Sequence, residues 1–209
     1  MEQRTDEWHA ARLGKVTASK IADIMAVGKN GKPLAGYENY MADLIAERLS
    51  GSPTAYFTNA AMEWGTETEP QARAAYRFLE GQDVEEVGFI DHPTIGDSGA
   101  SPDGLVGADG LVEIKCPNTK THLETLISET VPAKYIKQMQ WQMACTGRAW
   151  CDFVSFDPRL PDELHMFVRR VPRDDQMIGE MEEAVRAFLA AMFTKIEALK
   201  AKYSAKEAA

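Results

Sequence analysis

The sequence predicts a single α/β domain in which a mixed β-sheet is flanked by helices. The chain has 209 residues, a length that favours one domain over residues 1–209. Apolar residues make up 44% and charged residues 26%, as in ordinary globular proteins. Segments with helical and strand patterns follow one another as three helices, three strands, a helix, two strands and a helix, with no repeat or linker-like stretch.

The N-terminal part of the chain, residues 17–80, is predicted to be helical. Apolar residues recur at helical spacing in three stretches, which predict helices at residues 17–26, 37–49 and 59–80. Gly51 follows the second helix, where a left-handed residue commonly ends a helix. Gly65 and Pro70 predict a break or a kink in the third helix, because proline lacks the N–H that an inner helical turn needs.

The remainder of the chain mixes strands and helices. Short β-rich runs separated by turn residues predict strands at residues 84–91, 97–106, 111–116, 150–156 and 164–171. A helix is predicted at 133–145, between the third and fourth strands. A long amphipathic pattern predicts a C-terminal helix at 174–202.

Charge is unevenly distributed along the chain. The formal net charge is −9, which by itself argues against a general nucleic-acid binder. Residues 51–100 carry two basic and nine acidic side chains, whereas residues 12–32 carry five basic side chains and one acidic side chain. The basic segment fits either a solvated helix face or a site for an anion such as phosphate.

Cysteine use and hydropathy indicate the compartment. The three cysteines are an odd number without C-x-x-C spacing, which favours reduced thiols in a cytosol over a disulfide framework or a four-cysteine metal site. The longest apolar run, residues 187–193, is far shorter than the ~20 residues that span a bilayer, so no membrane association is expected. The polar N-terminal stretch predicts no secretory signal.

Residues 97–116 carry the most informative pattern, that of a β-hairpin. Two β-like runs are joined by Gly-Ala-Asp-Gly, a typical hairpin turn. Glu113 and Lys115 are two residues apart in the second run and therefore share a face. A three-residue loop at 108–110 would pair Asp103 with Lys115 and bring Asp103 to that face, whereas a two-residue loop would turn it to the opposite face.

Two carboxylates and a lysine on one face suit metal-dependent hydrolysis of a phosphodiester. Asp103 and Glu113 would attract a hard cation such as Mg²⁺, with the backbone carbonyl of Ile114 as a third oxygen ligand. Such a cation polarises a phosphoryl oxygen and activates water, and the ammonium of Lys115 can orient that water or offset charge in the transition state. Acyl transfer is disfavoured, since no serine or cysteine nucleophile with a paired base is visible. Taken alone, the same spacing also fits a surface hairpin with a Glu–Lys pair.

The surrounding sequence favours the functional interpretation. Pro102-Asp103 with Glu113-Ile114-Lys115 resembles the PD-(D/E)xK nuclease signature. Four more blocks look like those of the phage lambda-type alkaline exonuclease, or YqaJ-like viral recombinase, family: WHAARLGKVTAS (8–19), AMEWGTETEP (61–70), KYIKQMQWQM (134–143) and FDPR (156–159). The resemblance covers about residues 5–175 and implies a restriction-endonuclease-like PD-(D/E)xK core.

The resemblance also implies an activity. Members of this family are Mg²⁺-dependent, processive 5′→3′ exonucleases on linear double-stranded DNA, and Mn²⁺ is an alternative metal. They release mononucleotides and leave 3′ single-stranded tails, on which a single-strand annealing protein acts in recombination. The family further implies a homotrimeric ring and a phage or prophage protein in the bacterial cytoplasm.

The roles of five residues follow from this resemblance. Asp103 and Glu113 match the metal-binding carboxylates of the family, with the Ile114 carbonyl as a backbone ligand. Lys115 matches the catalytic lysine. Gln138 matches a glutamine placed near the attacking water.

Four further residues match positions around that centre. Glu69 matches an acidic residue that borders the metal site. Arg12, Ser19 and Ser101 match a pocket for the terminal 5′ phosphate. A guanidinium is a planar, bidentate phosphate binder, and Arg12 lies in the basic segment noted above.

Two positions depart from the family pattern. Lys29 stands where an arginine contacts duplex DNA, and lysine keeps the charge but loses the fork geometry. Met62 stands where a leucine acts as a strand-separating wedge, and methionine is apolar and flexible enough for that role.

Two other functions stay open on the sequence alone. One is a structure-specific or restriction-type DNA endonuclease of the same fold. The other is a non-catalytic module that binds DNA ends or recruits the annealing protein. Cleavage of closed circular DNA separates the first from an exonuclease, and metal-dependent release of mononucleotides excludes the second.

Overall fold

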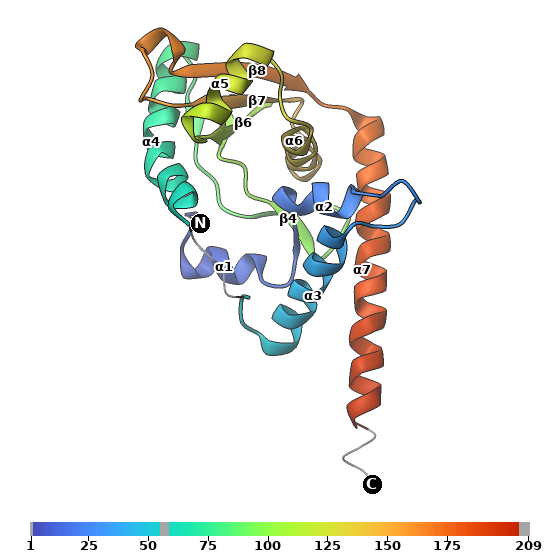
Figure 1. The fold of residues 1–209 in the computed structure, drawn as a ribbon. Helices are drawn as coiled ribbons and strands as arrows, with labels where there is room; N and C mark the ends of the chain where they lie inside the picture. Colours follow the sequence, from blue (N-terminus) through green and yellow to red (C-terminus); the bar gives the residue numbers. More distant parts are fainter. Residues whose placement is uncertain (1, 55–58, 205–209) are drawn as a thin grey trace.

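The computed structural model describes residues 2–54 and 59–204, which form two β-sheets surrounded by helices (Figure 1). The helices are α1 (Asp6–Arg12), α2 (Ile21–Met25), α3 (Ala35–Ser50), α4 (Ala60–Glu80), α5 (Thr119–Ser128), α6 (Ala133–Thr146) and α7 (Asp175–Ser204). The strands are β1 (Val16–Thr17), β2 (Val84–Glu85), β3 (Ile90–Asp91), β4 (Ser98–Ala100), β5 (Gly104–Val106), β6 (Gly110–Lys115), β7 (Trp150–Phe156) and β8 (Met166–Pro172). No helix within the described residues is both long enough and apolar enough to cross a membrane.

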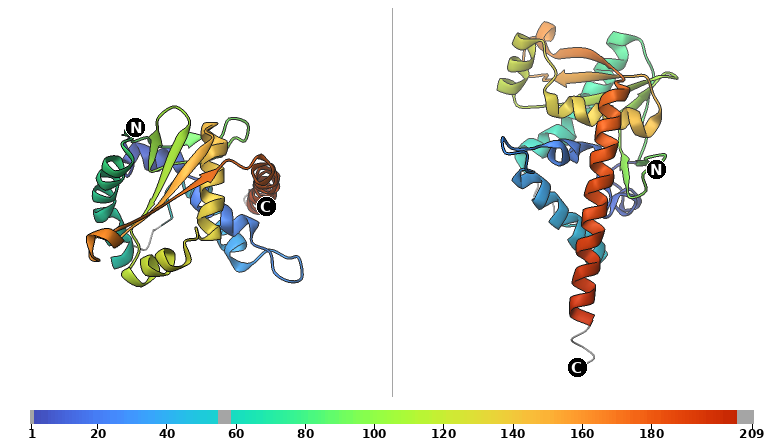
Figure 2. Two further views of the ribbon diagram at one scale, coloured as in Figure 1. Left: turned by 90° about the horizontal axis from the view of Figure 1, so that it is seen from above. Right: turned by 90° about the vertical axis from the view of Figure 1, so that its right-hand side faces the viewer.

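The larger sheet has the strand order β2-β5-β6-β7-β8 and is mixed. Strands β6 and β7 are parallel, and the other neighbouring pairs are antiparallel. Helix α4 covers one face, where Tyr76 joins a buried cluster with Val112, and α6 covers the other, where Met139 joins a cluster with Leu111. The left view of Figure 2 shows the sheet between these helices. The predicted class, a mixed sheet flanked by helices, is confirmed.

The smaller sheet, with the order β1-β4-β3, is not predicted by the sequence pattern. Two runs expected to be single strands are each divided between the sheets: 84–91 into β2 and β3, and 97–106 into β4 and β5. Pro102 lies at the second division, where a residue without an N–H cannot join the ladder. Residues 101–103 therefore cross from the smaller sheet to the larger one.

The helices agree with the sequence pattern in most places. The bounds of α3, α6 and α7 lie within two residues of those predicted. Helix α4 is not broken at Gly65 or Pro70: Pro70 is exposed, so the Thr66 carbonyl that loses its partner lies on the solvent side. Residues 17–26 begin as strand and 3-10 turn, and the helical part is shorter than predicted. Helices α1 and α5 are not predicted from apolar periodicity, because few of their residues are buried.

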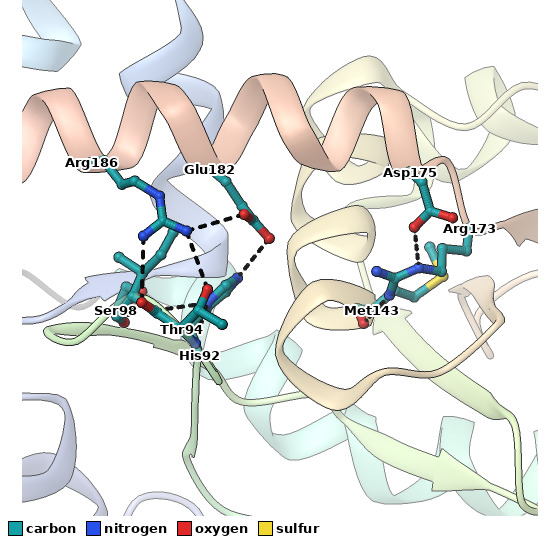
Figure 3. Close-up of polar contacts among 9 residues, drawn as sticks. His92, Thr94, Ser98, Met143, Arg173, Asp175, Glu182 and Arg186 are labelled. Carbon is teal, nitrogen blue, oxygen red and sulfur yellow. Dashed lines mark hydrogen bonds and ion pairs between the residues drawn. The ribbon is translucent and has the colours of Figure 1, made fainter.

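Helix α7 runs along one side of the molecule and continues past its body (Figures 1 and 2). Its first half is fastened to the turn between β3 and β4 (Figure 3). The Arg186 guanidinium donates to Thr94, and Glu182 faces His92 Nε2 at 3.4 Å. Burial lowers the pKa of His92, and its Nδ1 accepts backbone N–H groups of the turn, so the ring is neutral. These contacts fix the small sheet, from which residues 101–103 lead to the larger one.

A buried carboxylate links α4 to the larger sheet, and it gives a stability prediction. Asp152 accepts the hydroxyl of Tyr76 at 2.7 Å and two hydrogen bonds from Arg170. Tyr76→Phe removes one donor from a buried charged acceptor, which costs about 1.5–3 kcal/mol. We expect urea denaturation to give a free energy of unfolding lower by that amount. A decrease below about 0.5 kcal/mol would contradict the buried hydrogen bond.

Candidate active site

Strands β5 and β6 form the predicted hairpin with a loop of three residues. Val106 pairs with Gly110, so the loop is 107–109, one residue earlier than predicted. Gly107 has a φ of 52°, in the left-handed region that favours glycine, and the chain turns there. Gly110 is a strand residue, and a Cβ atom at this position would lie 2.1 Å from the Trp150 ring.

This register determines where Asp103 lies. Strand β5 begins at Gly104, which pairs with Val112, so Asp103 stands opposite Glu113. Asp103 therefore falls on the face of Glu113 and Lys115, as a three-residue loop requires. The predicted pairing of Asp103 with Lys115 is wrong by two residues, because the loop starts one residue earlier.

Asp103 lies just before the start of β5, in a cleft of about 450 Å³. Its Oδ2 accepts the Ile114 N–H at 2.7 Å, just before Gly104, the first paired residue of β5. The N–H and C=O of one strand residue point to the same side, so the Ile114 carbonyl also faces this edge. The cleft is lined by Arg4, Ala61, Met62, Gly65, Thr66, Glu69, Asp103, Ile114, Lys115, Cys116, Pro117 and Tyr135.

Electrostatics at this edge favour a cation. Burial and the charge of Glu113 raise the pKa of Asp103 well above its ordinary value. Burial alone would lower the pKa of Lys115, but the charges of Glu113 and Asp103 outweigh it and raise that pKa, so Lys115 stays an ammonium. One ammonium thus faces two carboxylates, and a further positive charge would relieve their repulsion.

Glu113 is fully buried, and both of its oxygens are engaged. Oε1 accepts Gln138 Nε2 at 2.7 Å and contacts Lys115 Nζ, and Oε2 accepts Gln142 Nε2 at 2.6 Å. Gln138 thus lies at the predicted site and donates a hydrogen bond to Glu113. Gln142 was not predicted, although its spacing of four residues from Gln138 on a helix is a signal that places both amides on one side.

Glu69 lies in the same cleft, from α4, between two arginines. Arg4 Nη2 and Arg73 Nη2 each donate to its carboxylate at 2.5 Å. Sequence reasoning missed Arg4, which has no motif around it. Its φ of 68° is in the left-handed region, and Gln3 fixes this turn by donating to the carbonyls of Val87 and Pro102.

The three residues predicted to hold a 5′ phosphate lie near one another. Arg12 Nη1 donates to Ser101 Oγ at 3.4 Å, and Trp8 Nε1 donates to the same oxygen at 2.9 Å. Arg12 and Ser19 line a smaller cavity of about 80 Å³, and Lys15 lines it too. Ser101 does not line this cavity, but it contacts Arg12, which does, and it is two positions before Asp103 in the chain.

The two residues that depart from the family pattern lie in different places. Met62 is half exposed and lines the cleft, where an apolar wedge would stand. Lys29 is exposed in the turn between α2 and α3, which projects from the body of the fold (Figure 1), and it does not line the cleft.

The residues at the cleft fit a hard cation that keeps part of its water shell. The oxygen donors are Asp103 and the Ile114 carbonyl, which line the cleft, and the Glu113 carboxylate, which is buried opposite Asp103; this is the donor class that Mg²⁺ prefers. Across residues 2–54 and 59–204 no three His, Cys, Asp or Glu side chains are arranged to hold a metal ion. Mg²⁺ needs no such cluster, because it is commonly bound through one or two carboxylates, with water completing its coordination.

Comparison with known proteins identifies the family. The model of the YqaJ-like viral recombinase domain matches residues 7–149, well over half of the chain. The chain belongs to the YqaJ-like viral recombinase family. The family expected from the five sequence blocks is therefore confirmed. No curated protein sequence matches this YqaJ-family chain.

Solved structures similar to this YqaJ-family chain include an alkaline exonuclease, LHK-Exo, from Laribacter hongkongensis. It is 56% identical, with 98% of this chain and 100% of that chain covered and a TM-score of 0.90. The structure of LHK-Exo in complex with dAMP has the same identity and coverage and a TM-score of 0.91. A phage-related exonuclease from Haemophilus somnus 129PT is 18% identical, with 88% and 96% covered and a TM-score of 0.73, and supports the fold alone.

Proposed function

We propose that this chain is a metal-dependent exonuclease that degrades linear double-stranded DNA in the 5′→3′ direction. One observation carries the proposal. A chain that is 56% identical over nearly its whole length to an alkaline exonuclease gathers two carboxylates and an ammonium at one sheet edge. That combination suits phosphodiester hydrolysis, in which charge develops on the phosphoryl oxygens and on the leaving oxygen.

The proposed metal is Mg²⁺, or Mn²⁺ in its place. Asp103, Glu113 and the Ile114 carbonyl would hold it. When bound, such an ion lowers the pKa of a coordinated water and polarises the phosphoryl oxygen. The raised pKa of Asp103 fits this assignment, because burial and then the charge of Glu113 raise it, and a bound cation would offset both the buried negative charge and the repulsion from Glu113.

The protein's own groups perform the remaining tasks. Lys115 is held as an ammonium beside Glu113, where it can offset negative charge on the transition state. The Gln138 amide donates a hydrogen bond to Glu113 and would orient water at the sheet edge where Asp103 and Glu113 lie. Glu69 accepts a hydrogen bond from Arg4 and so holds the Arg4 guanidinium in the cleft. There the guanidinium can bind a phosphate of the DNA backbone.

The direction of digestion follows from the phosphate pocket in this proposal. Arg12, Ser19 and Ser101 would bind the terminal 5′ phosphate. Ser101 and Asp103 are two positions apart in the chain, so their Cα atoms are at most about 7 Å apart, a distance of the order of one nucleotide step. A terminal phosphate held at Ser101 would therefore set the next phosphodiester over Asp103. This spacing supports the release of mononucleotides and the formation of 3′ single-stranded tails.

Assembly and partners are further parts of the proposal. The family supports a homotrimeric ring around DNA, which would make digestion processive, and a single-strand annealing protein that acts on the exposed tail. It also supports a phage or prophage protein that works in the bacterial cytoplasm. Sedimentation velocity on the full chain tests the trimer, and a monomer at the concentration of full activity would contradict it.

The proposed function is tested by a time course on linear duplex labelled at one 5′ end, beside nicked and covalently closed circles. We expect the linear DNA to release labelled mononucleotide with Mg²⁺, and EDTA to stop the reaction. The closed circle should remain intact. Cutting of the closed circle would favour the endonuclease alternative, and DNA binding without release of nucleotide would favour the end-binding module.

A further inference from the structure

Gln142 and Gln138 contact the same carboxylate from one side of α6. Gln142 is fully buried, and its Nε2 lies 2.6 Å from Glu113 Oε2, while Gln138 donates to Oε1. We infer that Gln142 is a positioning residue that fixes the Glu113 carboxylate for cation binding. This inference rests on the proposed function, in which Glu113 is a metal ligand.

The orientation of the Gln142 amide follows from its neighbours. A carboxylate only accepts hydrogen bonds, so the amide nitrogen, and not its oxygen, must face Glu113. At the other end, Gln142 Oε1 lies 4.0 Å from Sγ of Cys151, a weak donor on β7. Burial raises the pKa of the Cys151 thiol well above its ordinary value, so the thiol keeps its proton. The Asp152 carbonyl lies at 3.9 Å from the same sulfur, so Glu113 determines the orientation of the amide and the Cys151 contact agrees with it.

Gln142 restrains a side chain that would otherwise have freedom at its end. The terminal torsion of glutamate is broad and roughly two-fold, so packing alone does not fix which oxygen faces the cleft. Lys115 and Gln138 contact Oε1 of Glu113, and Gln142 donates a hydrogen bond to Oε2. Without Gln142, Oε2 would be a buried acceptor with no partner among the described residues, and only the contacts at Oε1 would restrain the carboxylate. Loss of such outer contacts to a metal ligand typically costs about 10–100-fold in metal affinity or activity.

Gln140 provides a matched control on the same helix. It is also buried, and its amide makes two hydrogen bonds, to the Pro172 carbonyl and from the Asp174 N–H. These contacts hold the junction between β8 and α7, and none reaches Glu113. Gln140→Met and Gln142→Met thus remove similar buried amides, but only the second removes a donor from Glu113.

The experiment compares the two variants with wild type as full-length proteins. Isothermal titration calorimetry measures the Kd for Mn²⁺ without DNA, and an exonuclease assay measures the Mg²⁺ concentration at half-maximal rate. We expect Gln142→Met to raise both values about 10–100-fold. Gln140→Met should leave both within about threefold of wild type while lowering the melting temperature to a similar extent. If Gln142→Met does not fold, Gln142→Asn, which keeps a polar amide too short to reach Glu113, is measured against the same thresholds.

Two failures can be told apart. If wild type binds Mn²⁺ and degrades DNA, but the Gln142 and Gln140 variants shift the metal dependence equally, the positioning role of Gln142 is overturned and the proposed function stands. If wild type neither binds Mn²⁺ nor degrades DNA under any metal condition, the proposed function fails and the inference falls with it.

Discussion

Asp103→Asn is expected to reduce DNA degradation by on the order of 10³-fold, because the neutral amide removes a charged ligand of the proposed cation. Time courses with 5′-labelled linear duplex at saturating Mg²⁺ measure the loss. The same substitution should stabilise the metal-free protein. The folded-state pKa of Asp103 is raised, so stability is lost as the pH rises from the ordinary carboxyl pKa through the raised folded-state pKa, and the uncharged amide escapes that loss.

Thermal melts at pH 8 provide the control for this variant. In EDTA, Asp103→Asn should melt at or above the wild-type temperature. Addition of Mg²⁺ should raise the wild-type melting temperature and leave that of the variant unchanged, since an ion that binds only the folded state stabilises it by mass action. Full nuclease activity in a folded Asp103→Asn protein would remove Asp103 from the mechanism.

Arg12→Ala is expected to abolish the preference for 5′-phosphorylated ends. A hydrogen bond between charged partners contributes about 1.5–3 kcal/mol, so digestion of phosphorylated ends should slow by about 10–100-fold. Digestion of unphosphorylated ends should change little. The matched control is Arg77→Ala, because Arg77 forms an exposed ion pair with Asp83, outside the cleft and the Arg12 pocket. A phosphorylated-to-unphosphorylated ratio like that of wild type in Arg12→Ala would mean that the phosphate binds elsewhere.

The sequence predicts the long elements well and the short connections poorly. Helices α3, α6 and α7 have several turns of apolar periodicity, and the predicted range of β7 is the observed one. The smaller sheet is built from strands of two or three residues, too short to show a period of two. Its strands are specified by long-range pairing, such as Val16 with Ser98, which no local pattern contains.

The candidate site also has residues whose positions the sequence predicts and residues whose positions it does not. Spacing alone places Glu113 and Lys115 on one face, because they share a strand. The position of Asp103 depends on the loop, and Gly107 moves the turn by one residue. Gln142 and Arg4 reach the site through tertiary packing, from α6 and from a turn before α1, so their roles appear only once the elements are assembled.

The central claim is that Asp103 and Glu113 bind a divalent cation beside the start of β5. Anomalous diffraction at the manganese edge, from crystals soaked in Mn²⁺, tests this claim most directly. The account predicts a peak within about 2–2.5 Å of an Asp103 oxygen and of the Ile114 carbonyl, with Glu113 completing the protein ligands. Strong peaks elsewhere with none at this edge, in crystals of protein that degrades DNA with Mn²⁺, would contradict it.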